Sequence, residues 1–339
     1  MNYEKYISKD DKYEFDISVV MVTYFQEKYI RKAIESILMQ ETSCSYEIII
    51  SDDCSEDRTV DIIREYERKY PEKIKVKINA RNLGIPKNVY SAECMATGKY
   101  MTFLSGDDYY IDKYRFQKQY EFLEKHKKFF GVTTNVEQRY EYNDKPFEVL
   151  PPKKYRGKAV TLKKYLDGAN MGTHGLMMRN IFVTLEGRNY FSLMVKASKT
   201  IDDTSSPLLM LNLGPIYSMD FNSVARRVLL GEDKHNFNSI YKPIISFHDH
   251  IVSYNYVNEN FPKKLDLYHT YEKLCIGAFT YCMKRGMHKK YKELYALVPD
   301  EYKGRHLRRN VVLKSVSDFF IRRAKMFIKK AVNHDFGAV

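Results

Sequence analysis

The sequence predicts an α/β protein with a mostly parallel, Rossmann-like sheet flanked by helices, followed by a helical C-terminal extension. Over residues 17–110, short β-branched and apolar runs alternate with stretches of helical periodicity, which is typical of right-handed βαβ units. After residue 230 glycine becomes scarce, while tyrosine, lysine and histidine become frequent. We therefore expect one domain over residues 1–230 and a basic, tyrosine-rich, helical domain over residues 231–339.

Composition limits the class of protein and its partners. With 339 residues, 44% hydrophobic and 29% charged, the chain is globular rather than disordered. A formal net charge of +13 favours an anionic partner, although a soluble protein that is merely basic is the alternative. The five cysteines lack the spacing of a zinc site or a disulfide framework, which indicates a reducing compartment. The charged N-terminus and the lack of long apolar runs predict a cytoplasmic protein.

The first two predicted strands flank an amphipathic helix. Residues 17–23 form a nearly all-apolar, β-branched run, as expected of a strand that is covered on both faces. A second strand is predicted over residues 46–50. Between them, apolar residues recur at helical spacing and predict one buried stripe, formed by Ile30, Ala33, Ile34, Ile37 and Leu38.

Two more strands complete the predicted parallel sheet. A second amphipathic helix precedes an alternating strand at residues 74–78. Pro86 suits the first position of a helix that we expect to reach Thr97, with Gly98 as its C-terminal cap. The fourth strand is the apolar run at residues 100–104.

Two acidic clusters follow strands of this sheet. Asp52 and Asp53 follow the second strand, and Asp107 and Asp108 follow the fourth. Because the carboxyl ends of parallel strands meet at one edge, we expect both clusters to face the same crevice. Carboxylates there can hold a hard cation against phosphate oxygens, whereas plain polar turns are the alternative. The glycine-rich fingerprints of dinucleotide and P-loop sites are absent from the sequence.

Four segments, in order and spacing, resemble the family 2 glycosyltransferases, which are inverting enzymes with the GT-A (nucleotide-diphospho-sugar transferase) fold. The resemblance extends over residues 16–227, and it implies a GT-A catalytic domain. The matching segments are Val20-Met21-Val22-Thr23-Tyr24, Ser51-Asp52-Asp53-Cys54-Ser55-Glu56-Asp57-Arg58-Thr59, Asn82-Leu83-Gly84-Ile85-Pro86-Lys87-Asn88 and Leu104-Ser105-Gly106-Asp107-Asp108-Tyr109-Tyr110.

The resemblance implies a donor site for a nucleotide sugar. The family's Asp-x-Asp motif corresponds to Asp107 and Asp108, which implies a divalent cation, Mn²⁺ or Mg²⁺, with Asp108 and Asp107 as its candidate ligands; in one arrangement Asp108 holds the metal and Asp107 reaches the ribose. Two positions depart from the family, since Ser105 replaces its first aspartate and Phe25 stands where asparagine is frequent. The residues implied to bind the nucleotide are Thr23, Tyr24, Asp52, Asp53, Asn82, Gly84, Lys87 and Asp107.

The resemblance also implies a catalytic base. An inverting transfer needs a carboxylate that deprotonates the acceptor hydroxyl, and Asp203 is the first choice, with Asp202 second. The alternative is an ordinary acidic helix N-terminus. His174, Arg226 and Arg227 are implied to contact the acceptor or the diphosphate; a structural histidine and plain surface charge are the alternatives.

The end of the chain predicts a basic amphipathic helix. An apolar stripe at helical spacing is bordered by lysine and arginine, which suits peripheral contact with the inner face of a membrane or, equally, packing on protein. The stripe consists of Leu313, Val316, Phe320, Ala324, Phe327 and Ala331.

The function that these observations predict is metal-dependent inverting transfer of a sugar from a nucleotide sugar, with UDP-sugar preferred. The acceptor would be a hydroxyl of a cell-surface glycan or a lipid-linked molecule. A nucleotidyltransferase on a similar sheet and a non-enzymatic module that binds an anionic polymer or a membrane are the alternatives. No nucleic-acid partner is expected, and the oligomeric state is not predicted.

Overall fold

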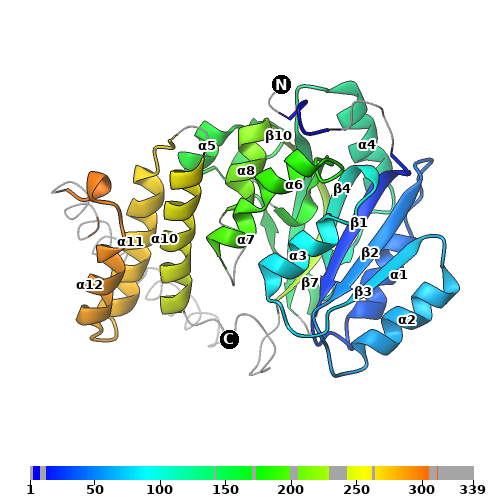
Figure 1. Ribbon diagram of the computed structural model, residues 1–339, viewed down its shortest axis with the longest axis horizontal. Helices are drawn as coiled ribbons and strands as arrows, with labels where there is room; N and C mark the ends of the chain where they lie inside the picture. Colours follow the sequence, from blue (N-terminus) through cyan, green and yellow to red (C-terminus); the bar gives the residue numbers. More distant parts are fainter. Residues whose placement is uncertain are drawn as a thin grey trace, which may run out of the picture. The chain divides into compact units, whose positions relative to one another are not determined.

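The computed structural model describes residues 3–7, 13–140, 143–169, 173–198, 205–228, 243–261, 264–304 and 311. The chain divides into two compact units, Met1–Ile240 and Tyr241–Val339 (Figure 1). Within the described residues, the first unit contains the sheet with its covering helices, and the second unit contains helices.

The sheet of the first unit has a parallel part and a mixed part. Its strand order is β3-β2-β1-β4-β9-β6-β10-β5, with β7 paired to β6 and β8 paired to β10. The parallel part consists of β1 (Phe15–Thr23), β2 (Tyr46–Asp52), β3 (Ile74–Ile78) and β4 (Gly98–Ser105). These four strands are the ones that the alternating apolar runs predicted.

The mixed part extends the sheet beyond β4. In it, β6 and β10 pair in parallel, whereas β9 pairs antiparallel with both β4 and β6. The remaining pairs, β10 with β5, β10 with β8 and β6 with β7, are antiparallel. The strands are β5 (Tyr109–Tyr110), β6 (Gly131–Tyr140), β7 (Asn143–Leu150), β8 (Lys158–Val160), β9 (Met177–Arg179) and β10 (Ile216–Val228).

Helices cover both faces of the parallel part. Alternate side chains of β1 and β2 join one apolar core with α1 (Ile30–Leu38), α2 (Thr59–Lys69) and α4 (Arg115–Lys125). The other face is covered by α3 (Ile85–Glu93). A hydrogen bond joins them, in which the Ser51 hydroxyl of β2 donates to Asn88 Oδ1 at 2.6 Å. The sheet is therefore buried on both faces, which fits the continuous apolar runs of its strands.

Shorter helices follow the mixed strands of the first unit. Two of them begin with a threonine side chain that accepts a backbone hydrogen bond, as is usual at a helix N-cap. They are η1 (Lys153–Tyr155), α5 (Leu162–Leu166), η2 (Thr173–Gly175), α6 (Leu185–Phe191), α7 (Leu193–Ala197) and α8 (Ser206–Leu213).

The predicted end of the third helix is wrong. Instead of reaching Thr97 with Gly98 as its cap, α3 ends at Glu93, and Gly98 is the first residue of β4. The physical reason is close approach of two strands, because a Cβ at Gly98 would lie 2.5 Å from the backbone nitrogen of Ser18. Glycine is needed at this position so that β4 can pair with β1.

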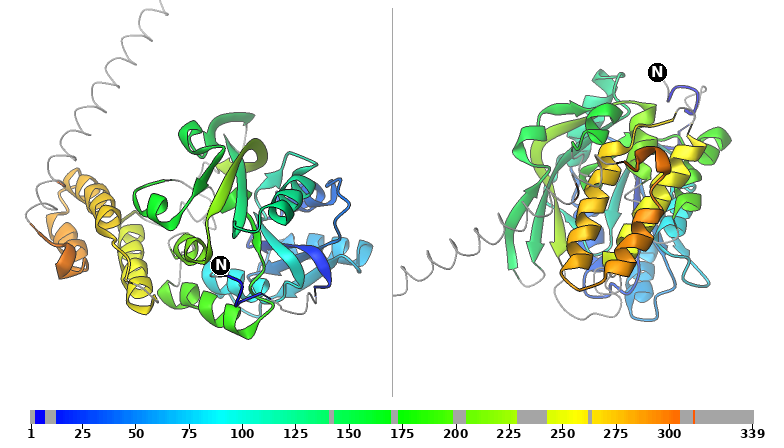
Figure 2. Two further views of the ribbon diagram at one scale, coloured as in Figure 1. Left: turned by 90° about the horizontal axis from the view of Figure 1, so that it is seen from above. Right: turned by 90° about the vertical axis from the view of Figure 1, so that its left-hand side faces the viewer.

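The second unit is helical in its described part. It contains α10 (Pro243–Asn260), α11 (Tyr268–Met283), α12 (His288–Ala296) and the short η3 (Asp300–Tyr302). The three longer helices pack against one another (Figure 2). Among the described residues, no helix is long and apolar enough to cross a membrane. The predicted basic helix that carries Leu313 and Ala331 lies outside the described residues.

Candidate active site

The two acidic clusters flank the end of β1. Thr23 lies opposite Asp52 in the β1–β2 ladder, and the Asp53 N–H donates to the Thr23 carbonyl at 3.0 Å. On the other side of β1, the Gly106 N–H donates to the Val22 carbonyl at 3.0 Å. The loops after β1, β2 and β4 therefore meet at the carboxyl edge of the parallel strands, where open α/β sheets bind ligands.

Two polar atoms at this edge are buried without a hydrogen-bond partner in the described part of the chain. They are Thr23 Oγ1 and Gln26 Oε1. Gly106 packs against both residues, because an added Cβ would meet Gln26 Oε1 first and would be 3.0 Å from Thr23 Cβ. Buried polar atoms are normally paired, so each of these two atoms lacks a partner that such an atom usually has. The sequence did not predict Gln26, and its only signal was a polar residue just beyond a buried strand.

The loops after β1 and β2 are joined by hydrogen bonds from backbone to side chain. The Phe25 N–H donates to Ser55 Oγ at 2.9 Å, and the Gln26 N–H donates to Thr59 Oγ1 at 2.8 Å. Phe25 and Cys54 both have left-handed backbones, with φ of 52° and 70°. Non-glycine residues adopt this conformation at a cost of about 1–2 kcal/mol, so the loops hold strain at the edge of the sheet.

Asp52 is buried and holds the turn that follows it. Its carboxylate accepts hydrogen bonds from the Ser55 backbone N–H at 2.8 Å and from Ser55 Oγ at 2.6 Å. Burial raises the pKa of Asp52 above its usual value, and the two bonds from Ser55 oppose that rise. Asp52 therefore shapes the loop that carries Asp53. Tyr24, which was predicted to bind the nucleotide, packs edge-on against Phe25, and their ring centroids are 4.6 Å apart.

Asp53 organises the segment that follows β3. Its carboxylate accepts from Asn79 Nδ2 at 2.9 Å, from the Leu83 N–H at 2.8 Å and from the Gly84 N–H at 2.9 Å. Asn82 Oδ1 also accepts from the Gly84 N–H, at 3.1 Å. The sequence predicted Asp53 as a direct nucleotide contact. The structure shows it binding the Asn-x-Gly segment, and this brings the predicted nucleotide residues of both loops to one edge.

Lys87 lies one turn further along the chain. It is exposed in the first part of α3. Its ammonium group thus adds positive charge beside the Asn-x-Gly segment, where the resemblance had predicted a role near the nucleotide.

The turn after β4 presents two adjacent carboxylates. Asp107 is half-buried and Asp108 is buried, and the Asp108 N–H closes the turn by donating to the Ser105 carbonyl at 3.0 Å. Burial raises the pKa of Asp107. The pKa of Asp108 is raised well above its usual value, mainly by burial and to a smaller extent by repulsion from Asp107. The positive charges of Arg226 and Arg227 lower the pKa of both aspartates and so oppose these rises. Two carboxylates in this position favour a cation beside them.

Arg227 clamps this turn from β10. Its backbone N–H donates to Asp108 Oδ1 at 2.8 Å, and its Nη1 donates to the Asp107 carbonyl. The guanidinium lies 5.1 Å from the ring centroid of Tyr29 and 4.6 Å from that of Tyr109. The sequence predicted that Arg227 would contact the acceptor or diphosphate. In the structure its guanidinium holds the backbone of the acidic turn, and the contact with the acceptor or diphosphate stays a prediction.

The other two predicted contacts lie on neighbouring elements. Arg226 is half-buried on β10 beside Arg227. His174 is half-buried in η2, next to Gly175, whose carbonyl accepts from Gln119 Nε2 at 2.9 Å. Asp202 and Asp203, the predicted base residues, lie outside the described residues.

The acidic turn fits a divalent cation. Asp108 uses one oxygen to accept the Arg227 N–H, so its second oxygen and the Asp107 carboxylate remain for a metal. The described residues contain no cluster of three or more histidine, cysteine or acidic side chains that could hold an ion. A cation here would therefore take its remaining ligands from diphosphate oxygens and water, as Mg²⁺ commonly does.

Comparison with known proteins shows the family and the fold to which this chain is similar. Residues 18–185 match the family described as Glycosyl transferase family 2. An uncharacterized protein of Mycobacterium tuberculosis is 34% identical over 140 residues, which are 41% of this chain and 40% of that protein. An uncharacterized glycosyltransferase of Methanocaldococcus jannaschii is 32% identical over 166 residues, which are 48% of this chain and 54% of that protein. The chain thus spans about two fifths to one half of the length of these relatives.

A third similar protein has solved structures. Staphylococcus aureus TarS, named as a poly(ribitol-phosphate) beta-N-acetylglucosaminyltransferase, is 33% identical over 111 residues, which are 32% of this chain and 19% of TarS. The crystal structure of TarS 1-349 in complex with UDP-GlcNAc has a TM-score of 0.61 and 18% sequence identity to this chain. The match covers 85% of this chain and 82% of that chain, and it shows a shared fold.

Proposed function

The chain contains a family 2 glycosyltransferase domain with the GT-A fold, and from this premise we propose that it is a metal-dependent, inverting enzyme that uses a UDP-sugar. The observation that carries the proposal is the edge where Thr23, the Asp52-Asp53 cluster and the Asp107-Asp108 turn meet. The UDP-GlcNAc complex of TarS supports the choice of donor nucleotide.

We infer that the nucleotide lies against the loops after β1 and β2. Thr23 Oγ1 and Gln26 Oε1 are buried without a partner in the described residues, and a side-chain rotation would turn either atom toward the base or ribose. Asp53 fixes the Asn82-x-Gly84 turn that borders this space. A hydroxyl both donates and accepts, whereas an amide oxygen only accepts, so this pair suits a ring N–H and its neighbouring carbonyl, as in uracil.

The acidic turn would hold the metal and the diphosphate. A divalent cation bound there would neutralise charge that develops on the departing nucleoside diphosphate. Asp108 would bind that cation through its free oxygen, with Asp107 on the ribose side. Arg227 holds this turn through two contacts, since its backbone N–H donates to the Asp108 carboxylate and its guanidinium donates to the Asp107 carbonyl.

We propose Asp203 as the base, with Asp202 as second choice, because inversion needs a carboxylate on the face opposite the leaving group. In this scheme the base removes the acceptor hydroxyl proton while that oxygen attacks the anomeric carbon and the bond to the nucleoside diphosphate breaks. The acceptor that we propose is a cell-envelope glycan or a lipid-linked molecule, a choice that the name of TarS supports. We place the enzyme in the cytoplasm, with peripheral membrane contact through the basic C-terminal segment.

A donor screen tests the proposal. The released nucleoside diphosphate is measured across UDP-, GDP- and TDP-sugars, with and without Mn²⁺. We expect release only from UDP-sugars and only with metal, and we expect Asp203→Asn to bind donor but transfer no sugar. If no nucleoside diphosphate raises the melting temperature of the protein, the non-enzymatic binding module becomes the better hypothesis. If the Asp203→Asn enzyme still transfers sugar, the assignment of Asp203 as the base is wrong.

A further inference from the structure

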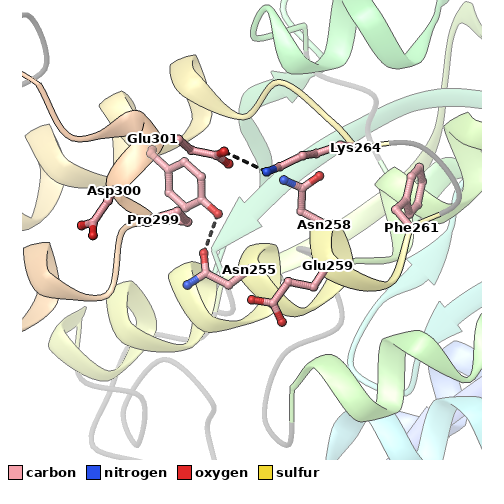
Figure 3. A pocket seen from close by; sticks show the side chains of 9 residues that line it. Asn255, Asn258, Glu259, Phe261, Lys264, Pro299, Asp300 and Glu301 are labelled. Carbon is pink, nitrogen blue, oxygen red and sulfur yellow. Dashed lines mark hydrogen bonds and ion pairs between the residues drawn. The ribbon is translucent and has the colours of Figure 1, made fainter.

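The second unit contains a pocket of about 470 Å³, which is within the range of roughly 300–1,000 Å³ usual for small-molecule sites. All of its lining residues belong to the second unit. They come from the end of α10, the segment before α11, α11 itself and the segment around η3, as Figure 3 shows.

The rigid part of the pocket is a hydrogen-bonded framework. The Tyr271 hydroxyl donates to Asn255 Oδ1 at 2.5 Å, and Asn255 Nδ2 donates to the Leu297 carbonyl at 2.8 Å. Asn258 Oδ1 accepts the Leu265 N–H at 2.6 Å, which fixes the chain as it leaves α10. Tyr271 and Asn258 are buried, so these bonds hold the pocket in shape without a ligand.

An ion pair supplies donors and acceptors at the mouth of the pocket. Lys264 Nζ lies 2.8 Å from Glu301 Oε2, and Figure 3 shows the two side chains reaching toward each other from separate segments, with Asn258 beside Lys264. Their side chains are 67% and 45% exposed, so each keeps hydrogen-bonding capacity for a ligand. An ammonium group has three N–H donors and a carboxylate has two acceptor oxygens. The ion pair uses one donor of Lys264 and one oxygen of Glu301.

The charge of the lining excludes a phosphate ligand. The lining is acidic, although the whole chain has a net charge of +13. It contains three carboxylates and one ammonium group: Glu259, Asp300, Glu301 and Lys264. Phe261 and Pro299 give the lining an apolar edge, of which Phe261 itself is 8% exposed. Donors and acceptors side by side suit a hydroxyl, which is both at once, and the apolar surface suits the C–H face of a sugar ring.

We propose that this pocket is a second carbohydrate site, which binds a neutral sugar residue of a glycan chain. A role in holding the acceptor rests on the proposed function, whereas sugar binding itself does not. The site requires neither the donor edge nor a metal, so the two proposals fail separately.

The test measures binding of two neutral probes, cellotriose and chitotriose, to the full chain by saturation-transfer NMR and calorimetry. The pocket variant is Lys264→Ala with Glu301→Gln. Exposed ion pairs contribute only about 0–1 kcal/mol, so this variant should fold. A control removes the Lys290–Glu293 pair of α12, which is also an exposed lysine–glutamate pair, with its atoms 2.9 Å apart. A second control is Asp108→Asn, which impairs the donor edge alone.

We expect at least one probe to bind the wild type and both controls with similar affinity, and the pocket variant to bind about tenfold more weakly or worse, since hydrogen bonds to charged groups are lost. Failure of both probes to bind would overturn the proposal. Equal binding by the pocket variant would place the sugar elsewhere, and loss of binding in Asp108→Asn would place it at the donor edge. If spermidine binds and displaces the sugars, the pocket is a cation site and the carbohydrate proposal is wrong.

Discussion

Replacing Asp108 by asparagine should weaken metal-dependent nucleotide binding while leaving the fold intact. The asparagine side chain keeps an oxygen that can accept the Arg227 N–H, now at 2.8 Å, so the turn after β4 should survive. The charge is lost. A carboxylate and a cation about 4 Å apart attract each other by roughly 4 kcal/mol at an effective dielectric of about 20. Part of this loss is offset because a neutral asparagine costs less to bury than a charged aspartate. We therefore expect nucleotide affinity in Mn²⁺ to fall about 100-fold, which is about 2.7 kcal/mol.

The metal-free protein should respond in the opposite direction. Asp108 is buried beside Asp107, and these two causes raise its pKa, so its charged form is unfavourable without a cation. Removing the charge should stabilise the free protein by on the order of 1 kcal/mol, or about 1–2 °C in melting temperature for a chain of 339 residues. Thermal-shift curves with and without MnCl₂ and UDP measure both effects, and Asp61→Asn on the exposed face of α2 is the control. A destabilised variant that keeps the full Mn²⁺–UDP shift would refute the reasoning.

Three further predictions concern the residues around this turn. Arg227→Lys keeps the charge but loses the planar group that lies against two rings, so Mn²⁺–UDP affinity should fall about tenfold by calorimetry, whereas Arg226→Lys should change it far less. Burial alone would raise the pKa of Glu47, yet three hydrogen-bonding neighbours lower it, so its stabilisation is present above the unfolded pKa of about 4.3 and is lost as pH falls through the folded value. Glu47→Gln should cost about 2–3 kcal/mol at pH 7 and flatten the acid limb of a urea-denaturation series; an unchanged pH profile would contradict this. Gly106→Ala would press a methyl group to 3.0 Å from Thr23 Cβ, so UDP affinity should fall more than stability, and intact UDP binding would show that the edge adapts.

The parallel strands and their acidic ends were predictable because their signals are local. The apolar runs that predicted residues 17–23 and 74–78 correspond to β1 and β3, and the first helix was predicted over the same apolar stripe that α1 buries. The antiparallel strand β9 was not predicted. Its three residues, Met177–Arg179, owe their strand geometry to β4 and β6 on either side, and such distant partners leave no periodic signal in so short a run.

The roles of individual site residues were harder to predict than their location. The sequence places Asp53 at the end of a strand but does not reveal that the N–H groups of Leu83 and Gly84 already occupy its carboxylate. In the same way, the sequence does not reveal that the Arg227 guanidinium lies beside the rings of Tyr29 and Tyr109, which come from two distant segments. Side chains of this kind acquire their roles from partners that the fold supplies.

Phe25 shows how a departure from the family pattern carries structural information. Its φ of 52° is a conformation that asparagine tolerates better than phenylalanine, which explains why the family's asparagine suits this position. Here the N–H of Phe25 binds Ser55 and its ring meets Tyr24, and these contacts offset a strain of about 1–2 kcal/mol. The sharp turn keeps the chain after β1 close to the Asp52–Ser55 loop. Phe25 therefore ties together the two loops that border the proposed donor site through one hydrogen bond, and its ring contact with Tyr24 packs the first of these loops.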